Sequence, residues 1–250
     1  MIDKGVIVMA ASAETIQRFK EMVQGSNNIV FFGGAGVSTE SGIPDFRSVD
    51  GLYNQKYKYP PETILSHTFY RENPEEFYKF YRDKILSHDA KPNAAHLKLA
   101  QLEKEGKLKA VITQNIDGLH QAAGSKNVLE LHGTVHRNYC QKCGKFFDAK
   151  YMRDYKGVPK CDACGGDIKP AVVLYEESLD MDVMERAVKY ISEADMLIIG
   201  GTSLVVYPAA GLINYYHGHK LVLINKGSTS ADSSADLVIA DSIGAVMSQI

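Results

Sequence analysis

The spacing with the most specific chemistry in this chain belongs to its four cysteines, which are all that the sequence contains. They form two C-x2-C pairs with 17 residues between the pairs: Cys140, Cys143, Cys161 and Cys164. Gly144 and Gly165 stand directly behind the pairs, where glycine lets the backbone turn so that two thiolates face one point. Four thiolates fill the coordination sphere of zinc and leave no position for water or substrate. We therefore predict a structural zinc centre, with two disulfides or one redox C-x2-C as the alternatives.

A second candidate site follows the apolar run NIVFF, which leads directly into glycines as many dinucleotide sites do. Backbone amides of Gly34, Ala35 and Gly36 could approach a pyrophosphate, and the hydroxyls of Ser38 and Thr39 could donate further hydrogen bonds. A Rossmann fingerprint for hydride transfer would have a third glycine at the position of Thr39. The loop therefore predicts dinucleotide binding of another kind, with a plain glycine turn as the alternative.

A hydride-transfer enzyme would also have an acidic residue about 20 positions further on, ending a second strand, to hold the adenosine ribose. Glu62 lies near that distance, but Pro60 and Pro61 argue against a buried parallel strand at this point. An ordinary NAD-dependent oxidoreductase is therefore disfavoured.

Polar residues also follow the apolar runs KAVIT, VLEL, MLIIG and KLVLI. The carboxyl ends of parallel strands are where α/β proteins bind ligands. Amides, a carboxylate and an imidazole would meet there, although a single histidine is more often a loop or capping residue. The residues at these strand ends are Gln114, Asn115, Asp117, His132, Gly201, Thr202, Ser203 and Asn225.

The apolar runs themselves predict the fold. Runs rich in Val, Ile and Leu alternate with stretches of helical period, at 28–32, 109–113, 128–131, 196–200, 220–225 and 236–240. This pattern favours an α/β fold with a Rossmann-like parallel sheet and helices on both faces. The first two runs lie about 75 residues apart, and the third and fourth lie more than 60 apart. Because one crossover helix needs far less chain, both gaps are predicted to be insertions that fold as a smaller lobe.

Composition limits the partners. The chain has 250 residues, 45% of them hydrophobic and 23% charged, with a formal net charge of −2, so no global field draws it to nucleic acid or a membrane. Its apolar runs are much shorter than the roughly 18 residues of a membrane span, and its first residues do not form a secretory signal. We expect a cytoplasmic protein. Residues 137–170 hold eight basic against four acidic side chains, which keeps a nucleic-acid-binding zinc adaptor as the rival hypothesis.

Five motifs in order resemble the sirtuin family of NAD-dependent protein lysine deacylases. They are GAG-x-S-x-x-S-G-I-P-D-F-R, T-Q-N-I-D-x-L-H-x-x-A-G, E-L-H-G, the paired C-x2-C, and G-T-S-L-x-V-x-P-A. The resemblance covers nearly the whole chain and implies that NAD and acyl-lysine meet in a cleft between two lobes. On this basis the large Rossmann-type NAD-binding domain comprises residues 1–47, 91–136 and 171–250. The small domain comprises the helical insertion at 48–90 and the zinc module at 137–170.

The resemblance also implies residue roles. The acyl oxygen attacks C1′ of the ribose as nicotinamide leaves, and His132 is the general base, with Asn115 and Asp117 as further catalytic residues. An imidazole suits this task because its unperturbed pKa of about 6.5 lies near working pH. In the implied cofactor site Phe46 shields the ribose carbon, while Asp117 and Ile116 hold the carboxamide. The remaining implied NAD contacts are Gly34, Ala35, Gly36, Ser38, Thr39, Arg47, Gln114, His132, Gly201, Thr202, Ser203, Asn225 and Ile243.

Two stretches depart from the family pattern. Gly33 stands where threonine is common. In VVLYEESL, Tyr175, Glu176 and Glu177 replace Phe-Gly-Glu, beside which the family lays its peptide substrate as an added strand. Glu176 brings a side chain where glycine has none. The implied substrate residues are Tyr175 together with Val172 and Val173, which would line an acyl-lysine tunnel or simply form a buried strand.

A separate feature of the sequence bears on acyl selectivity. Sirtuins that prefer succinyl-lysine or malonyl-lysine resemble one another in a Tyr-x-x-Arg on a helix of the first insertion, whereas this chain has Tyr81 and Lys84. Lysine lacks the two-pronged geometry by which arginine binds a carboxylate. We therefore predict acetyl-lysine as the preferred substrate.

Overall fold

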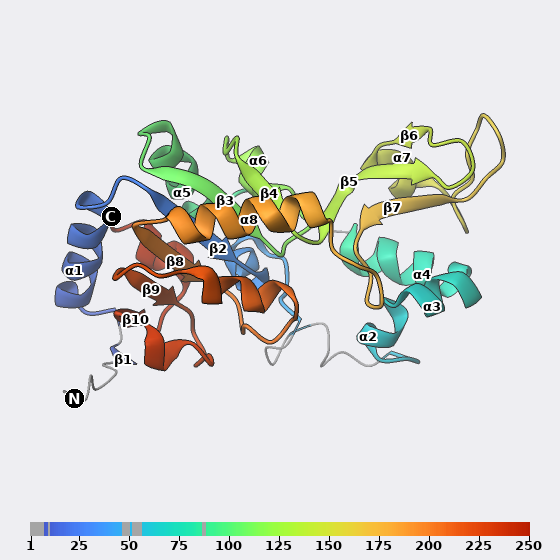
Figure 1. Cartoon of the computed structure of the whole chain (residues 1–250). Helices are drawn as coiled ribbons and strands as arrows, with labels where there is room; N and C mark the ends of the chain where they lie inside the picture. Colours follow the sequence, from blue (N-terminus) through green and yellow to red (C-terminus); the bar gives the residue numbers. More distant parts are fainter. Residues whose placement is uncertain (1–7, 10, 47–50, 52–56, 87–88) are drawn as a thin grey trace.

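The computed structural model describes residues 8–9, 11–46, 51, 57–86 and 89–250. Its centre is a seven-stranded sheet, in the order β1-β10-β9-β8-β2-β3-β4, whose strand pairs are all parallel (Figure 1). Six strands lie on the apolar runs, which confirms the α/β prediction; the two-residue β1 was not predicted. The strands are β1 (Val8–Met9), β2 (Ile29–Gly33), β3 (Leu108–Thr113), β4 (Val128–Glu130), β8 (Met196–Gly200), β9 (Leu221–Ile224) and β10 (Leu237–Ile239).

Helices cover both faces of the sheet because successive strand residues point to opposite sides. In β2, Phe31 belongs to one core, and Val30 and Phe32 belong to the other. The first core lies under α1 (Ala13–Gln24), α5 (Ala94–Lys104) and α9 (Ile243–Met247). The second lies under α8 (Met181–Glu193) and the 3₁₀ helix η5 (Ala209–Tyr215). Shorter helices occupy the connections: η1 (Ala35–Val37), η2 (Thr39–Ser41), α6 (Leu119–Ala122) and η6 (Asp232–Ser234).

The strand order places the ligand crevice. From β2 the chain adds β3 and β4 on one side, and from β8 it adds β9 and β10 on the other, so the direction of winding reverses between β2 and β8. At such a reversal the loops leaving the two neighbouring strands diverge and open a crevice at the carboxyl ends. The loops beginning at Gly34 and at Gly201 are these two loops.

Both insertions surround a third core, to the right of the main sheet in Figure 1. The first contributes α2 (Pro61–Ile64), α3 (His67–Glu72), α4 (Pro74–Phe80) and the π-helical turn η4 (Tyr81–Ile85). The second contributes an antiparallel sheet in the order β6-β5-β7 and one helix: β5 (Gly133–Cys140), β6 (Phe146–Phe147), α7 (Ala149–Asp154) and β7 (Ile168–Val172). Phe77 and Tyr78 from α4 share this core with Cys140 and Cys161, so the helical and cysteine-bearing segments pack as one body.

Candidate cofactor crevice and metal centre

Glycines at the ends of β2 and β8 let two backbones touch. A Cβ on Gly34 would lie 2.8 Å from Cβ of Thr202, and a Cβ on Gly36 would lie 2.8 Å from Cα of Gly201. Gly201 itself has φ +58, and a Cβ there would lie 2.3 Å from the backbone nitrogen of Val37. These contacts are shorter than any side chain allows. The glycines are therefore needed for the packing of one loop against the other, a role that the sequence did not predict.

This packing uses two of the three amides that were expected to cradle pyrophosphate. Gly34 donates its N–H to the carbonyl of Gly200 at 3.3 Å, and Gly36 donates to the carbonyl of Gly201 at 2.8 Å. Within the described ranges, the N–H of Ala35 has no acceptor. Of the three, Ala35 is thus the amide left to meet an anion.

The hydroxyls of Ser38 and Thr39 were also expected to face phosphate, and here the structure differs. Ser38 is buried, donates to Oδ2 of Asp117 at 2.6 Å and accepts from Nδ2 of Asn115 at 3.0 Å. Thr39 donates to the carbonyl of Gly36 at 3.0 Å. Both hydroxyl protons are therefore used inside the protein. Ser38 instead joins the β2 loop to the β3 loop and fixes the two side chains that it touches.

Asp117 is held at both carboxylate oxygens. Its Oδ1 accepts the N–H of Leu119 at the start of α6, at 2.9 Å, while Oδ2 binds Ser38. Gly118 between them has φ +72, and a Cβ there would lie 2.6 Å from the ring of His136. Nε2 of His136 in turn lies 3.0 Å from the carbonyl oxygen of Asp117. The carboxylate is therefore fixed in one orientation beside the crevice.

His132 follows β4, and its hydrogen bond shows that Nδ1 carries a proton. Nδ1 lies 3.0 Å from the carbonyl oxygen of Gln114, and because a carbonyl can only accept, Nδ1 carries the proton. Burial lowers the pKa of His132, and the bond to Gln114 offsets this only in part. The imidazole is therefore neutral near pH 7, with Nε2 unprotonated and bonded to no described residue.

The segment that follows β7 lies beside His132. Val173 donates its N–H to the carbonyl of His132 at 3.0 Å. Gly133 permits this approach: it has φ +73, and a Cβ there would lie 1.9 Å from the carbonyl oxygen of Ala171. Val172 is buried in the small-lobe core, Val173 is half-buried, and Tyr175 is exposed. The buried-strand alternative thus describes Val172, whereas Val173 and Tyr175 remain accessible.

The remaining crevice residues differ in how deeply their side chains are buried and in what they contact. Gln114 Nε2 lies 3.4 Å from the hydroxyl of Thr202, which joins the β3 end to the β8 end. Asn225 directly follows β9 and donates to the carbonyl of Gly227 at 2.8 Å, and Ser203 is half-buried. Ile243 is only 3% exposed, and its side chain packs against Gly200 in the main core, so the side chain cannot line an open adenine site. Phe46 and Ile116 lie against the small-lobe core, and Arg47 falls outside the described residues.

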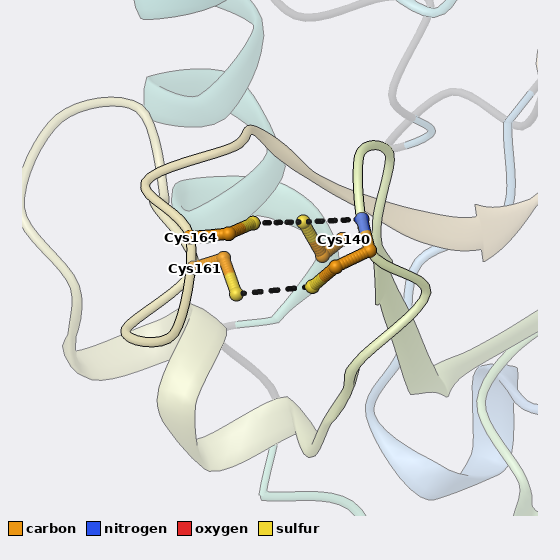
Figure 2. A group of neighbouring side chains, drawn as sticks. Cys140, Cys161 and Cys164 are labelled. Atoms are coloured by element: carbon orange, nitrogen blue, oxygen red, sulfur yellow. Dashed lines mark hydrogen bonds between the residues drawn. The ribbon is translucent and has the colours of Figure 1, made fainter.

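The four cysteine sulfurs converge as predicted (Figure 2). Sγ of Cys140 lies 3.4 Å from that of Cys164, Sγ of Cys143 lies 3.6 Å from that of Cys161, and all four fall within 4.8 Å of one another. A disulfide would need about 2.05 Å. Sulfurs at the corners of a tetrahedron with Zn–S bonds of about 2.3 Å lie about 3.8 Å apart. The arrangement fits a tetrathiolate zinc ion and not two disulfides.

Backbone around the sulfurs also suits a metal. Gly144 and Gly165 have φ +72 and +70, as their position behind each pair predicted. Two backbone N–H groups point at Sγ of Cys140, that of Lys142 at 3.4 Å and that of Cys143 at 3.5 Å, and such donors stabilise the thiolate that binds metal. A Cβ on Gly166 would lie 2.9 Å from the sulfur of Cys140, so the chain closes tightly over the cluster.

Five of the eight basic side chains of residues 137–170 are paired with carboxylates, and two of these carboxylates, Glu130 and Glu177, lie outside the segment and reduce its surplus of four positive charges to two. Lys145 lies 2.6 Å from Asp162, Arg137 lies 2.9 Å from Glu130, and Lys169 lies 3.0 Å from Glu177. Lys160 pairs with Asp167, and Lys150 pairs with Asp154. Paired cations attract phosphate less, which weakens the hypothesis of a nucleic-acid-binding adaptor. The helices of the described chain are also all too short or too polar to cross a bilayer.

Comparison with known proteins decides the family. Residues 34–208 match the Sir2 family. The chain belongs to this family. It is 62% identical over 240 residues to an NAD-dependent protein deacetylase of Clostridium acetobutylicum, covering 95% of this chain and 98% of the relative. It is 63% identical over 240 residues to a protein of the same name from Clostridium perfringens, with the same coverage.

Solved Sir2 structures share the fold over the whole length. One described as "Structural Basis for the Mechanism and Regulation of Sir2 Enzymes" has a TM-score of 0.86 and 38% identity, covering 95% of this chain and 96% of its own. Another, a Sir2 variant with a deacetylated peptide and 3'-O-acetyl ADP ribose, has a TM-score of 0.87 and 40% identity, covering 94% and 96%. The sirtuin resemblance and the Rossmann-like fold with its smaller lobe are therefore confirmed.

One residue that sequence reasoning missed joins the crevice loops of this Sir2-family protein. Asn93 caps α5, and its Nδ2 donates to the carbonyl of Val37 at 2.7 Å and to the hydroxyl of Ser41 at 3.0 Å. It therefore anchors both 3₁₀ helices of the β2 loop to α5. Its place as a cap before the apolar period of residues 94–104 was visible in the sequence, but its contacts 52 and 56 residues away were not.

Proposed function

We propose that this protein removes acetyl groups from protein lysines in a reaction that consumes NAD and yields nicotinamide, O-acetyl-ADP-ribose and free lysine. The observation that carries the proposal is the state of His132. A neutral imidazole whose Nδ1 is fixed as donor presents Nε2 as a base at the carboxyl edge of the sheet. A base at this place suits removal of a proton from a ribose hydroxyl, and Val173 holds an accessible segment beside it.

The relatives support the same reaction. Both Clostridium proteins are named NAD-dependent protein deacetylases, and a similar solved structure, 40% identical with a TM-score of 0.82, is described as Sir2 bound to acetylated peptide. At 62% identity over nearly the full length, this chain acts on the same class of substrate: acetyl-lysine in proteins or peptides.

For the crevice residues we propose the roles that the family resemblance implies. Asp117 and Ile116 hold the carboxamide of nicotinamide, Asn115 and Gln114 meet the ribose hydroxyls, and Phe46 shields the ribose carbon. Asp117 suits this role because Ser38 and Leu119 fix its carboxylate before ligand arrives. Ala35 offers its N–H to the pyrophosphate. The adenosine half lies near Thr202, Ser203 and Asn225, and near the backbone of Ile243.

We also propose the division into domains that the sequence predicted: 1–47, 91–136 and 171–250 as the NAD-binding domain, and 48–90 with 137–170 as the small domain. The three separate cores support it, although β5 begins four residues earlier, at Gly133. The small domain contains one structural zinc ion. Four cysteines placed for metal, none within disulfide distance, support a cytoplasmic location.

Mass spectrometry of an acetyl-lysine peptide incubated with protein, with and without NAD, tests the proposal. We expect the peptide to lose its acetyl group only with NAD, with one nicotinamide released for each lysine. Transfer of biotinylated NAD to protein without deacetylation would instead identify an ADP-ribosyltransferase. Since the lowered pKa keeps His132 neutral, the acid limb of kcat/KM should lie below the ordinary histidine value of about 6.5.

A further inference from the structure

A tight turn follows β7, and its third residue has an unusual conformation. The N–H of Glu177 donates to the carbonyl of Leu174 at 3.0 Å, which closes the turn Leu174-Tyr175-Glu176-Glu177. Glu176 at the third position has φ +75. A positive φ at this place is what a type II turn requires, and glycine normally supplies it. A glutamate there needs a compensating interaction.

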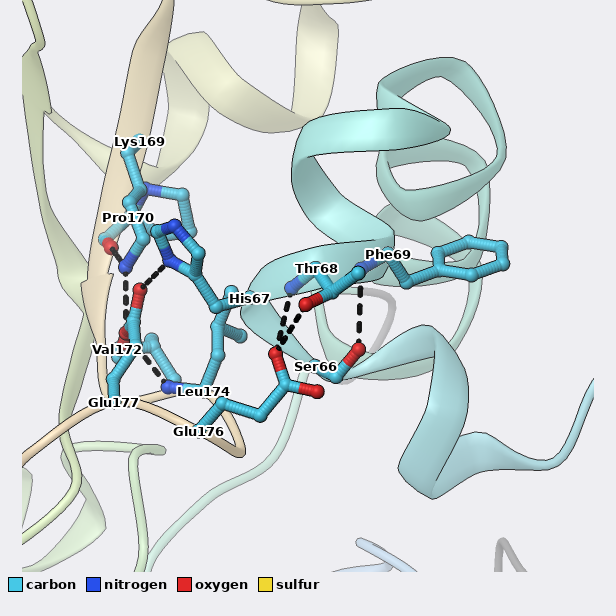
Figure 3. A network of polar contacts seen from close by, with 10 residues as sticks. All are labelled: Ser66, His67, Thr68, Phe69, Lys169, Pro170, Val172, Leu174, Glu176 and Glu177. Carbon is cyan, nitrogen blue, oxygen red and sulfur yellow. Dashed lines mark hydrogen bonds and ion pairs between the residues drawn. The ribbon is translucent and has the colours of Figure 1, made fainter.

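The side chain of Glu176 supplies that interaction (Figure 3). Its Oε2 accepts the backbone N–H of Thr68 at 2.9 Å and the hydroxyl of Thr68 at 2.7 Å. These two bonds lower the pKa of Glu176, so the carboxylate is ionised at neutral pH. Thr68 lies in α3 of the helical insertion, 108 residues away in sequence. The tip of the turn is thereby fixed to the helical insertion.

Glu177 makes a second connection in the same direction. Its Oε1 lies 2.8 Å from Nδ1 of His67, and its Oε2 accepts from Lys169 at 3.0 Å and from the N–H of Leu174 at 2.9 Å. Lys169 also donates to the carbonyl of Val172 at 3.0 Å, so Glu177 joins β7, the turn and α3. We call the contacts of Glu176 with Thr68 and of Glu177 with His67 the clasp.

Backbone hydrogen bonds next to the clasp fix the orientation of the turn. Tyr175 donates its N–H to the carbonyl of Leu65 at 3.0 Å and accepts from the N–H of His67 at 3.0 Å, which makes a short parallel bridge. The N–H of Glu176 donates to no residue in the described part of the chain. The neighbouring amides are already used: Val173 donates to His132, Leu174 to Glu177 and Tyr175 to Leu65. The N–H of Glu176 lies at the exposed tip of the turn, three residues after Val173. A carbonyl of an extended substrate peptide can accept from such an amide.

We infer that Glu176 is a positioning residue for the acyl-lysine peptide: its bonds to Thr68 hold the turn against α3 so that the N–H of Glu176 is preorganised to donate to the backbone of the substrate. The inference rests on the proposed deacetylase function and deepens it. Preorganisation removes the cost of ordering the turn when peptide binds. Loss of the two bonds between Glu176 and Thr68 should therefore weaken peptide binding and leave the chemistry at His132 intact.

Four variants and one control test this role with an acetyl-lysine peptide and NAD. Glu176→Ala removes both bonds, and we expect the KM for peptide to rise about five- to tenfold with kcat and the KM for NAD within about twofold. Glu176→Gln keeps an acceptor oxygen and should remain within about twofold of wild type. Thr68→Val keeps the N–H but loses the hydroxyl, so its KM should be intermediate. The control Glu72→Ala alters an exposed glutamate of the same helix and should change nothing.

Glu176→Gly separates the clasp from backbone strain. Glycine tolerates the positive φ, so the variant should match or exceed the Tm of Glu176→Ala while showing the same raised KM for peptide. If Glu176→Gly restored the wild-type KM, strain and not the clasp would explain the alanine result, and the inference would be wrong. An unchanged KM in Glu176→Ala, or an equal loss in kcat and in the KM for NAD, would overturn it as well.

A direct binding measurement distinguishes the two possible failures. Fluorescence anisotropy gives the Kd of a labelled acetyl-lysine peptide, independently of turnover. Wild-type protein that neither binds this peptide nor releases nicotinamide refutes both the function and the role of Glu176. Wild-type protein that turns over, with a peptide Kd unaltered by Glu176→Ala, refutes the role of Glu176 alone.

Discussion

The metal centre and the cofactor crevice are built from opposite kinds of chain. The four cysteines lie on two local turns between Cys140 and Cys164, and each turn brings its own pair together. The crevice takes its residues from strand ends spread between Gly34 and Asn225, which only the strand order makes neighbours. Residue types and spacing alone define the first site. For the second they define the residues but not the contacts.

Glycine shows the same contrast. Gly144, behind a cysteine pair, has φ +72 and open space where a Cβ would lie. At Gly36, in the crevice, a Cβ would lie 2.8 Å from Cα of Gly201. In the metal centre glycine provides a conformation, and in the crevice it provides room. Zinc removal, substitution of His132 and paired glycine substitutions each change one of the two regions and show whether the other responds.

Zinc removal should have the largest effect. Cys140 and Cys161 share a core with α4 and with Val172, so loss of the metal loosens the whole small lobe, including the edge beside His132. We expect complete loss of deacetylase activity and faster amide exchange in β5 and β7, with β2 and β8 still protected. Restored zinc should restore activity. Full activity in a sample whose zinc absence is confirmed by elemental analysis would contradict this dependence.

His132→Ala should have the next largest effect, confined to the crevice. A general base contributes about 100- to 10,000-fold, so kcat should fall by at least about 100-fold. The Kd for NAD should stay within about tenfold, because a base acts on the transition state more than on ground-state binding. His217→Ala, at an exposed histidine, is the matched control. Turnover close to wild type in His132→Ala would exclude His132 from the mechanism.

A pair of glycine substitutions tests the contrast between conformation and room. Gly36→Ala forces the β2 and β8 loops apart, and we expect a loss of about 1–3 kcal/mol in unfolding free energy together with a raised KM for NAD. Gly144→Ala meets no atom but must adopt a positive φ, at a cost of about 1–2 kcal/mol, with the KM for NAD unchanged. Denaturant unfolding and NAD kinetics measure both. A KM for NAD that changes equally in the two variants would show that the regions are not separate.

The sequence predicted the α/β sheet, the convergence of the four cysteines and the polar strand ends, because each depends on a local pattern of apolar runs or of residue spacing. It did not predict hydrogen bonds set by strand order. Ser38 binds Asp117 and not phosphate, since the β2 and β3 loops lie side by side. The side chain of Ile243 lies in the core for a similar reason: α9 lies on one face of the sheet and packs this side chain against Gly200 in β8. These contacts join residues that are far apart in the sequence, so no local sequence pattern predicts them.

The helical turn η4 also differs from what the sequence predicted. The comparison of Tyr81 with Lys84 assumed an α-helix, in which residues three apart share a face. Residues Tyr81–Ile85 instead form a π-helical turn, whose wider winding separates the two side chains further around the axis. Tyr81 is 1% exposed, and its hydroxyl has no hydrogen-bond partner among the residues that the structure describes.

The smallest effect we predict is a preference of the enzyme for acetyl-lysine over succinyl-lysine. Lys84 already lies 3.3 Å from Asp83 and 5.5 Å from the ring centre of Tyr57, so a succinyl carboxylate would have to compete with these contacts for a flexible point charge. Because Tyr81 lies in the core and no longer shares a face with Lys84, the pair cannot grip a distal carboxylate together. We expect kcat/KM on matched peptides to favour acetyl by about tenfold, the scale of one modest polar contact. The variant Lys84→Arg supplies the planar fork and should narrow that ratio only slightly, since the π-helical turn still separates it from Tyr81. A succinyl value equal to or above the acetyl value in wild type would show that Lys84 does anchor the carboxylate despite this geometry.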